Sequence, residues 1–395
     1  MKSPCLALLL SAALAQAASP PVVSNIRPSQ IAGTKNVQIL YDVSDADGDA
    51  LTITIQISGD AGLTYTIPAT ALSGHIGANV SPGNNRSIIW NAGVDWNGQL
   101  VTTAKVRIAA SDGTFPAPPP GMAYIPSGPF QMGGNLDGMT DALPTHNVQV
   151  DAFFMDRTEV SKELWQSVQS WSTAHGYTGL SAGAFAAAGH PVQSITWYDM
   201  VKWCNARSEK ENLTPVYYTD LAQTVVYRTG SVNLTNAQVN WTANGYRLPT
   251  EAEWEKAARG GPLGKRYPWG DTIAGSQANY SGSGDPFEAA GTPTTPVGYY
   301  NGSQVPAGVD MANGYGLYDM SGNVWEWCWD WYDATYYGNA AANNNPRGPA
   351  AAQSYRVPRG GAWFGSTYDL LCARRFANAP GNAVVIYGFR CVRGL

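Results

Sequence analysis

Residues 313–332 read NGYGLYDMSGNVWEWCWDWY, and this stretch decides the fold of the larger part of the chain. Near its end a tryptophan occupies every second position, at Trp325, Trp327, Trp329 and Trp331. Successive side chains of a strand point to opposite faces, so this period of two predicts a buried β-strand with the indoles on one face and Glu326 and Asp330 on the other. The glycines and asparagines upstream supply the positive φ angles of a tight loop. We therefore expect a glycine-shaped loop that leads into an aromatic strand.

This loop carries oxygen atoms that suit a calcium ion. Asp319 and Glu326 offer carboxylates, and Gly322 and Val324 offer backbone carbonyls within one turn of chain. Calcium prefers such hard oxygen ligands, whereas zinc prefers sulfur and nitrogen. The alternative is that both carboxylates only accept hydrogen bonds from backbone amides of the loop. The pattern leaves both interpretations open.

The first residues are typical of a secretory signal peptide. Lys2 precedes an apolar run from Leu6 to Ala15, and the small residues of Ala-Gln-Ala at 15–17 are typical of a cleavage site. The run is too short for a membrane anchor, which needs about 20 apolar residues. We expect residues 1–17 to be removed and the protein to be secreted, extracellular or periplasmic. No later segment has the length and apolar character of a membrane span.

The composition agrees with an exported, loop-rich protein. Only 13% of the residues are charged, and the chain has 43 glycines and 14 tryptophans. The net charge of -5 and the lack of a basic cluster exclude a nucleic-acid-binding surface. Four cysteines follow the signal peptide: Cys204, Cys328, Cys372 and Cys391. An even number of cysteines in an oxidising compartment predicts disulfides, and the alternative is buried thiols.

Residues 18–113 have the pattern of an all-β domain. Apolar and polar residues alternate in short runs between glycine, asparagine, aspartate and proline turns, at 37–43, 51–57, 63–69, 86–90 and 103–110. This spacing predicts an immunoglobulin-like or fibronectin-like β-sandwich. Asp45, Asp47 and Asp49 could bind calcium, although an Asp/Gly cluster of this kind is more often a turn.

A proline-rich segment, residues 114–120, then predicts an extended linker, and residues 121–395 form a second domain. Helix starts are expected at Ser161, Thr196 and Thr250, because each precedes apolar residues at helical spacing, and the last two have an acid three positions later. Gly260 and Gly261 end the third helix. Few helices among many irregular segments indicate an α+β domain dominated by loops.

Several motifs of this second domain resemble the formylglycine-generating enzyme (sulfatase-modifying factor) family. They are GLYDMSGNVWEW within the opening stretch, GYRLPTEAEWEKAARGG at 245–261, YPWGD at 267–271, RGGAW at 359–363 and YGFRCVR at 387–393. The resemblance extends in the same order from Met122 to Arg393. It implies the family's fold, which is a variant of the C-type lectin fold with little regular secondary structure.

The resemblance also implies two structural calcium ions. The first ion would be held by Asn279, Tyr280, Asp285 and Phe287, and the second by Asp319, Gly322, Val324 and Glu326. At the second site an aspartate stands where the family usually has asparagine, and either side chain can offer an oxygen. Such ions would tie down long loops that are otherwise costly to order.

The catalytic cysteines of the family are missing from the corresponding stretch. The active enzymes have two cysteines after RGG that bind copper, whereas this chain has Gly365 at the first position and the Asp369/Leu370 region at the second. Cu(I) needs sulfur or imidazole ligands, and neither position supplies one. His75, His146, His175 and His190 have no metal-binding spacing and are expected to pack loops. The sequence therefore predicts no copper and does not support oxidase chemistry.

The remaining cysteines match structural positions of the family. The resemblance implies one disulfide between Cys204 and Cys391, and we expect Cys328 to pair with Cys372. The arginines Arg359, Arg374, Arg375 and Arg390 are expected to pair with buried acids such as Asp330.

These features favour a secreted, non-catalytic member of the family that binds a partner or assembles outside the cell. Its surface would be the loop at 363–371, and the expected ligand-binding residues are Trp363, Phe364, Ser366, Thr367, Tyr368 and Arg374. The partner would be a protein, a peptide, a glycan or further copies of the chain in a homopolymer. The alternative is a formylglycine-generating-type oxidase, or another metal-dependent oxidase of the same superfamily, with an altered active centre.

Overall fold

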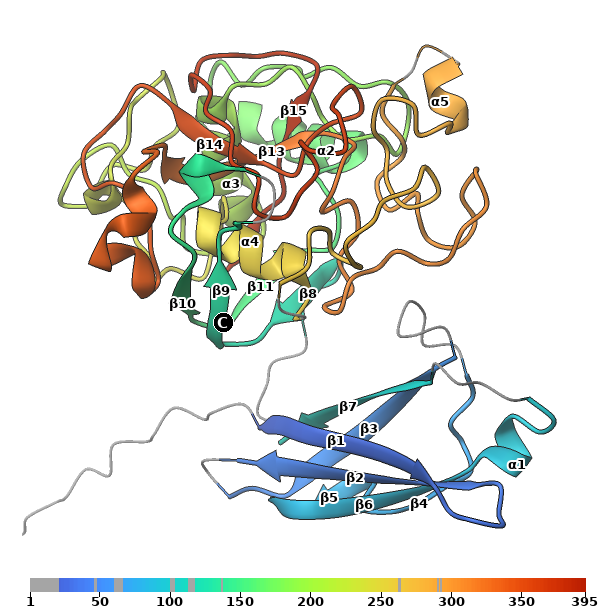
Figure 1. The fold of residues 1–395 in the computed structure, drawn as a ribbon. Helices are drawn as coiled ribbons and strands as arrows, with labels where there is room; N and C mark the ends of the chain where they lie inside the picture. Colours follow the sequence, from blue (N-terminus) through green and yellow to red (C-terminus); the bar gives the residue numbers. More distant parts are fainter. Residues whose placement is uncertain are drawn as a thin grey trace, which may run out of the picture. The chain divides into compact units, whose positions relative to one another are not determined.

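A computed structural model gives the fold of the chain (Figure 1). It describes residues 21–45, 48–59, 67–99, 104–112, 118–135, 138–261, 264–289, 291 and 293–395. The expected signal peptide at 1–17, linker residues 114–117 and Asp47 lie outside these ranges. The chain divides into two compact units, Met1–Pro116 and Ala117–Leu395.

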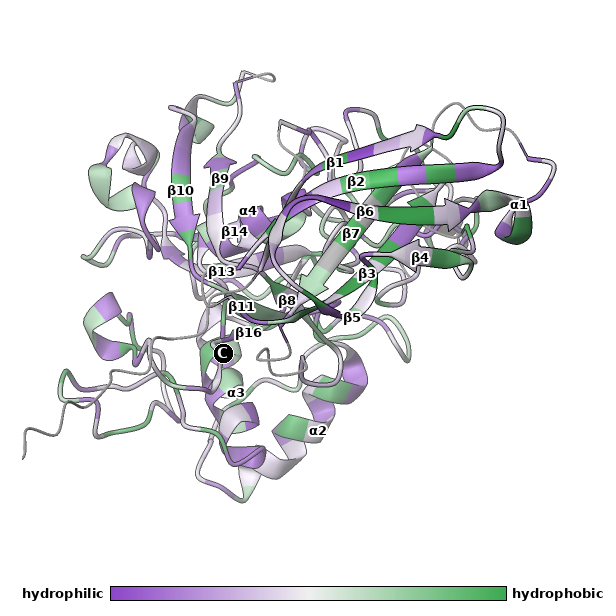
Figure 2. Ribbon diagram, turned by 90° about the horizontal axis from the view of Figure 1, so that it is seen from below, coloured by the Kyte–Doolittle hydropathy of each residue, from purple (hydrophilic) through white to green (hydrophobic). Residues whose placement is uncertain are grey.

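The N-terminal unit consists of two small sheets that share one core. The first sheet has the order β1 (Val22–Gln30), β2 (Asn36–Ser44), β6 (Gly83–Asn91) and β4 (Leu72–Gly74), and the second has the order β5 (Gly77–Val80), β3 (Leu51–Ser58) and β7 (Lys105–Ser111). A short helix, α1 (Ala92–Asp95), follows β6. Alternate residues of β2 and β3 are buried in the common core, and Figure 2 shows this alternation of hydropathy along β2.

The strands of this unit agree with the hydropathy pattern except at 63–69. Residues 63–66 lie outside the described ranges, and Ile67 forms only an isolated bridge with Ile57. The pattern also did not identify β1, β4 and β5, because they alternate weakly or are very short.

Three helices of the C-terminal unit begin where the capping residues predict: α2 (Lys162–Thr173), α3 (Trp197–Lys210) and α4 (Glu251–Arg259). The short helix α5 (Pro286–Ala289) was not predicted. Ser161 accepts a hydrogen bond from the amide of Leu164, and Thr196 and Thr250 each form a reciprocal capping box with the acid three positions later. Gly260 ends α4 in a left-handed conformation with φ of 61°.

The strands of this unit form three small sheets. Their orders are β12 (Tyr246–Arg247), β16 (Val392–Arg393), β11 (Phe153–Asp156) and β8 (Met122–Ile125); β10 (His146–Val150) and β9 (Gly128–Met132); and β14 (Arg356–Arg359), β13 (Trp325–Trp331) and β15 (Tyr387–Gly388). Short 3-10 helices lie at Thr140–Ala142, Asn236–Gln238, Tyr336–Gly338 and Ala340–Asn343. Loops make up most of the remaining chain, as the sequence predicts.

The aromatic strand β13 lies at the centre of this unit. All seven of its residues are buried, so the acids are as inaccessible as the indoles. Trp325, Trp327 and Trp329 enter one hydrophobic core together with residues of α3, whereas Cys328 enters a second core together with residues of α4. The predicted strand is confirmed, and it separates two cores.

None of the helices in the described ranges is long and apolar enough to cross a membrane.

Candidate functional site

The loop 363–371 is shaped by the glycines that follow β14. Gly360 and Gly361 have φ angles of 93° and 79°, and a side chain on Gly361 would come within 2.6 Å of Leu370. Only glycine combines this backbone conformation with so close an approach. Hydrogen bonds from the Gly365 amide to the Ala362 carbonyl (2.8 Å) and from the Asp369 amide to the Ser366 carbonyl (2.9 Å) then fold the loop back on itself.

The two positions at which the resemblance implies catalytic cysteines in the family lie close together in this loop. A β-carbon built on Gly365 would lie 3.3 Å from both Cβ and Oδ2 of Asp369. The pair offers a carboxylate and no sulfur. The loop itself therefore has no ligand for Cu(I).

Aromatic side chains of this loop are open to solvent. Phe364 is 51% exposed and Tyr368 is 37% exposed, whereas Trp363 is half-buried. The Trp363 ring lies 5.6 Å from the Phe364 ring, and its Nε1 donates a 3.4 Å hydrogen bond to the Val385 carbonyl. Val385 is itself 51% exposed. These residues form an apolar surface of the kind that marks interaction sites.

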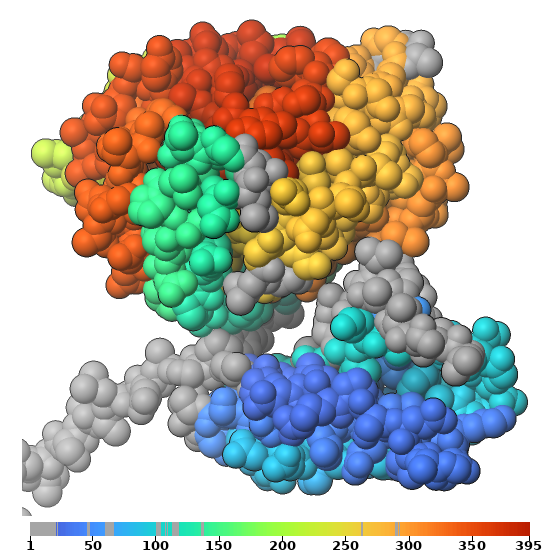
Figure 3. Space-filling model, in the orientation of Figure 1, coloured from blue at the N-terminus to red at the C-terminus, as the bar shows by residue number. Residues whose placement is uncertain are grey.

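A polar rim accompanies the aromatic side chains. The amide and hydroxyl of Ser366 each donate a 3.0 Å hydrogen bond to Asp369 Oδ2, and Arg374 Nε lies 3.7 Å from Asp369 Oδ1. The Arg374 guanidinium also lies 5.1 Å from the Tyr368 ring centre. Thr367 is exposed, and its carbonyl accepts a hydrogen bond from the Tyr267 hydroxyl. Contacts thus join Trp363 to Phe364, and they join Ser366, Tyr368 and Arg374 around Asp369. Figure 3 shows the C-terminal part of the chain, coloured red, at the surface of this unit.

The loop is fastened to both stretches expected to bind calcium. The amide of Trp363 donates to the Asn323 carbonyl (2.9 Å), and the Gly365 carbonyl accepts from the amide of Ser281 (3.1 Å). A third hydrogen bond, from the Asn323 amide to the Asn279 carbonyl (3.0 Å), joins the two stretches to each other. Order in these stretches therefore sets the position of the aromatic loop.

The first of these stretches contains an oxygen that lacks a partner. Asn279 is 1% exposed, and its Nδ2 donates to the Pro293 carbonyl, but its Oδ1 accepts no hydrogen bond from the described residues. Asp285 is 2% exposed and accepts from the Ser283 hydroxyl and the Phe287 amide. Buried polar atoms are nearly always satisfied. A calcium ion bound to Asn279 and Asp285 would satisfy the free oxygen, so these residues fit the implied ion.

The second stretch fits a cation with a different set of acids. Arg390 donates to both carboxylate oxygens of Glu326, at 2.6 and 2.7 Å, and Trp254 Nε1 adds a third hydrogen bond at 2.8 Å. Glu326 is therefore already compensated. Asp319 accepts a hydrogen bond from the Gly298 amide at 2.5 Å, and its carboxyl group also interacts with that of Glu159. Burial raises the pKa of Asp319.

Glu159 is the residue at this site that sequence analysis missed. It is 2% exposed, and one oxygen accepts from Asn323 Nδ2 at 3.0 Å, whereas Oε2 has no partner among the described residues. Burial and the neighbouring charge of Asp319 raise the pKa of Glu159 well above its ordinary value. Two adjacent buried carboxylates without a cation of their own are unfavourable, and a bound cation would compensate them. The sequence shows Glu159 as an acid within DRTEV at 156–160, but its position in the sequence does not indicate that it lies next to Asp319.

Neither stretch is a conventional cluster of charged ligands. The described ranges hold no group of three or more His, Cys, Asp or Glu side chains that could bind a metal. Any calcium ion would thus depend on Asn279 and on backbone carbonyls as well as on carboxylates.

The buried arginines hold the fold together. Arg359 pairs with Glu251 at 2.9 Å and Glu255 at 2.5 Å, and Arg375 pairs with Glu251 at 2.7 Å. Asp330 is not their partner, contrary to the expectation from sequence. Its Oδ2 accepts from the Glu251 amide at the start of α4 (2.8 Å), and none of the ion pairs in the described ranges includes it.

The four histidines have separate roles in loop packing. His175 stacks on Trp171 with ring centres 3.7 Å apart, His146 lies 4.8 Å from the Tyr337 ring, and Nδ1 of His190 lies 2.9 Å from the Thr294 hydroxyl. His75 belongs to the other unit, where it contacts Ser87. They therefore form no metal site within the described residues.

All four cysteines are buried thiols in this structure. The Sγ atoms of Cys204 and Cys391 lie 3.6 Å apart. Burial raises the pKa of Cys372 to about 12 and that of Cys328 well above its ordinary value. Little thiolate is available at neutral pH, so neither is a reactive nucleophile. Both disulfide pairings stay predictions.

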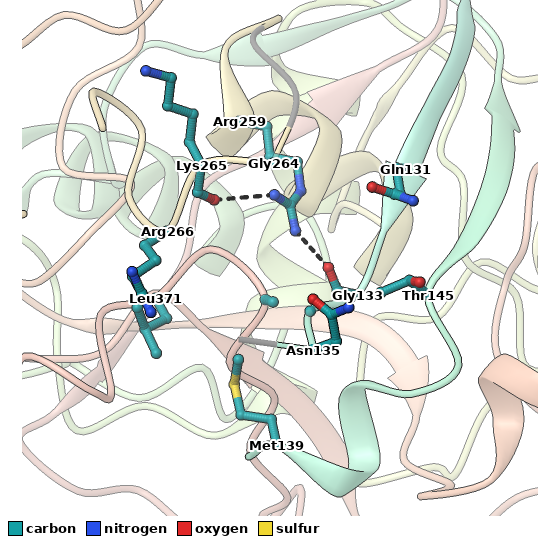
Figure 4. A pocket seen from close by; sticks show the side chains of 12 residues that line it. Gln131, Gly133, Asn135, Met139, Thr145, Arg259, Gly264, Lys265, Arg266 and Leu371 are labelled. Atoms are coloured by element: carbon teal, nitrogen blue, oxygen red, sulfur yellow. Dashed lines mark hydrogen bonds between the residues drawn. The ribbon is translucent and has the colours of Figure 1, made fainter. Parts of the chain in front are cut away.

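One small cavity lies beside the end of the 363–371 loop. It measures 50 Å³, and Arg259 crosses it, with hydrogen bonds to the carbonyls of Lys265 and Gly133 at 3.2 and 2.8 Å (Figure 4). Space of this size holds water and excludes most organic ligands. The candidate binding site is therefore the exposed loop surface and not this cavity.

Comparison with known proteins gives the same motifs a family context. A family model described as the sulfatase-modifying factor enzyme 1-like domain matches residues 109–395. The serine/threonine-protein kinase pkn1 of Chlamydia caviae is 34% identical over 279 residues, which cover 69% of this chain but only 38% of the kinase. The formylglycine-generating enzyme of Bos taurus is 32% identical over 301 residues, covering 71% of this chain and 76% of the enzyme. The solved structure of Treponema denticola variable protein 1 is similar with a TM-score of 0.54 and 31% identity, covering 69% of this chain and 95% of that one.

Proposed function

Since the chain belongs to the family of sulfatase-modifying factor enzyme 1-like domains, we propose that it is a secreted, non-catalytic member that binds a partner through its 363–371 loop. The observation that carries this proposal is the exposed aromatic surface of Phe364 and Tyr368 at the place where the active enzymes have cysteines. Aromatic side chains are the commonest anchors of binding surfaces. The partner would be a peptide, a glycan, another protein or a second copy of the chain.

Two calcium ions would support this surface. We assign the first to Asn279 and Asp285 with the carbonyls of Tyr280 and Phe287, and the second to Asp319 with the carbonyls of Gly322 and Val324. The hydrogen bonds from Trp363 to Asn323 and from Ser281 to Gly365 would transmit the order of these stretches to the binding loop. Calcium here would be structural and would take part in no reaction.

The rest of the molecule would serve export and presentation. We assign the N-terminal unit to the immunoglobulin-like or fibronectin-like sandwiches, because its two antiparallel sheets share one core. The second unit would have the C-type-lectin-like fold, and disulfides at Cys204–Cys391 and Cys328–Cys372 would suit an oxidising compartment. Such a presenting module joined to a binding module suits an adhesion or filament protein.

Binding is tested with the mature chain on peptide and glycan arrays and by sedimentation velocity. We expect either array signals or concentration-dependent association, and we expect Phe364→Ser combined with Tyr368→Ser to abolish it. Arg228→Gln, which changes a partly buried ion pair elsewhere in the same unit, is the control and should leave binding unchanged. A strictly monomeric protein that binds no array, or a loop variant that behaves like wild type, would contradict the proposal.

The oxidase alternative has a separate test. Oxygen uptake is measured in the presence of copper, a reducing agent and cysteine-containing peptides. The wild-type chain is compared with a double variant that carries Gly365→Cys and Asp369→Cys. We expect no uptake by the wild-type chain. Peptide-dependent uptake by the wild-type chain would overturn the non-catalytic assignment.

A further inference from the structure

A second hollow of the C-terminal unit lies outside the 363–371 loop. Its inner part is a cavity of 170 Å³ that three distant segments enclose: the turn between β10 and β11, the residues before and within α4, and residues 345–347. The side chains that matter here are those of Trp241, Arg247 and Arg347. None of them has a part in the function proposed above.

Arg347 is a cation without an acidic partner. Its Cζ lies 4.1 Å from the centre of the Trp241 ring, so the guanidinium stacks on the indole. Arg247 lies 5.4 Å from the same ring, but Glu253 neutralises it through two hydrogen bonds of 2.6 and 2.7 Å. Within the described ranges no acid lies within ion-pairing distance of Arg347. Burial and the charge of Arg247 lower the pKa of Arg347, and the more distant charges of Glu253 and Asp151 offset this effect only in part.

Two cationic and two acidic side chains line the cavity, so the lining has no net charge. The cations are Arg247, which is paired with Glu253, and Arg347. The acids are Glu253, which is paired, and Asp151, whose Oδ2 accepts a 2.8 Å hydrogen bond from Asn345. Among these four charged side chains, Arg347 is therefore the one that has no hydrogen-bond or ion-pair partner within the described ranges. A guanidinium with free donors in such a setting suits a carboxylate, which it can bind through two parallel hydrogen bonds.

The cavity continues into an open hollow of 630 Å³, and both share Asn345, Pro346 and Arg347. The amide side chains of Asn236, Asn339 and Asn344 line this hollow, and their NH2 groups donate no hydrogen bond within the described ranges. Amides that both donate and accept hydrogen bonds match the hydroxyls of a sugar. The remaining lining is mostly glycine, proline and alanine, together with Asp333, Tyr336 and Gln353. Asp333 accepts two hydrogen bonds from Thr335, and Tyr336 is only 8% exposed, so the hollow offers a peptide little apolar surface as an anchor.

We propose that this cavity and hollow bind an acidic saccharide, with a sugar carboxylate on the Arg347 guanidinium and the hydroxyls on the asparagine side chains. The size of the open hollow lies within the usual range of ligand pockets. This site is independent of the 363–371 loop, so the two assignments can fail separately.

Isothermal titration calorimetry of the mature chain tests this assignment. The probes are a trisaccharide of galacturonic acid, the neutral trisaccharide maltotriose and a triglutamate peptide. We expect binding of the acidic sugar, and at least a tenfold weaker affinity in Arg347→Gln. Lys210→Gln removes the same charge from the end of α3, where the ammonium contacts Ser167, and should stay within twofold of wild type.

Thermal unfolding of each variant checks that it is folded, and Arg347→Lys serves as a second variant. The lysine keeps the charge but loses the paired donors, so we expect an intermediate affinity. Equal affinity for maltotriose, tighter binding of triglutamate, an unchanged affinity in Arg347→Gln, or no binding of the acidic sugar up to about 10 mM would each overturn the assignment.

Discussion

Arg375 and Arg374 are adjacent in sequence but belong to regions of opposite character. Arg375 is 1% exposed and is held by Glu251 at 2.7 Å, together with Arg359 in the same buried network. Arg374 is 22% exposed and lies 3.7 Å from Asp369 at the rim of the aromatic loop. The buried network holds its charges in several hydrogen-bonded ion pairs, whereas the loop leaves aromatic rings in solvent. The comparison separates residues that hold the fold from residues available to a partner.

The largest effect is expected from breaking the buried network. Arg359→Ala removes one of the arginine partners of both Glu251 and Glu255. Removing one member of a buried ion pair costs about 3–5 kcal/mol of unfolding free energy. Urea denaturation measures this loss. Arg374→Ala is the matched control, because a partly exposed pair contributes about 0–1 kcal/mol. Similar losses in the two variants would remove the distinction between the regions.

Removal of calcium should lower both the stability of the fold and the affinity of the loop for its partner. A tightly bound ion at saturating concentration stabilises a protein by about 2–4 kcal/mol, so chelation should lower the unfolding free energy by that amount. Because Trp363 and Gly365 are hydrogen-bonded to the calcium stretches, chelation should also weaken partner binding. Elemental analysis should find roughly two calcium ions per chain, and Asn279→Ala should lose one. A chain that contains no calcium and does not respond to chelation would refute this link.

The buried side chain of Lys256 should make the unfolding free energy depend on pH. Burial lowers the pKa of Lys256 to about 8 from 10.5. Between these two values the unfolded chain binds more protons than the folded chain, so the contribution of Lys256 to stability rises with pH. Relative to Lys256→Met, the wild type should gain about 2 kcal/mol between pH 7 and pH 10.

Urea denaturation of both proteins at several pH values gives this difference. Their difference cancels the titration of the tyrosines, which is common to both. A difference that does not change with pH would mean that Lys256 keeps an ordinary pKa in the fold.

The smallest effect on stability is expected in the loop. Phe364 and Tyr368 are exposed, so replacing both with serine should change the unfolding free energy by no more than about 0.5 kcal/mol. Phe130→Ser, at a residue 8% exposed in the core near α4, is the contrasting variant and should lose several times more. A large loss in the loop variant would mean that these rings support the fold.

Local signals in the sequence were enough for much of the fold. Reciprocal capping at Thr196 and Thr250 fixes where two helices begin, and the period of two in the tryptophan stretch fixes β13. These signals depend on neighbours three or fewer positions away, so they can be read without the tertiary structure.

Long-range pairing could not be obtained in this way. Glu159 and Asp319 are 160 positions apart, and Trp241 and Arg347 meet only because loops bring them together. Asp330 was expected to pair with arginine, but its carboxylate instead accepts a hydrogen bond from the Glu251 amide at the start of α4. Glu326 was predicted to bind calcium, and no pattern in the sequence indicated that Arg390 would donate to both of its oxygens. In each case the tertiary fold determines which groups contact each other, and the spacing of residues in the sequence does not predict these contacts.

The most direct test of the central claim is the affinity of the mature chain for its strongest array ligand, compared between wild type and the double variant Phe364→Ser with Tyr368→Ser. If the loop is a binding surface separate from the fold, the variant should lose at least tenfold in affinity while its unfolding free energy stays within about 0.5 kcal/mol of wild type. An unchanged affinity in a folded variant would contradict the claim, because the partner would then bind elsewhere on the molecule.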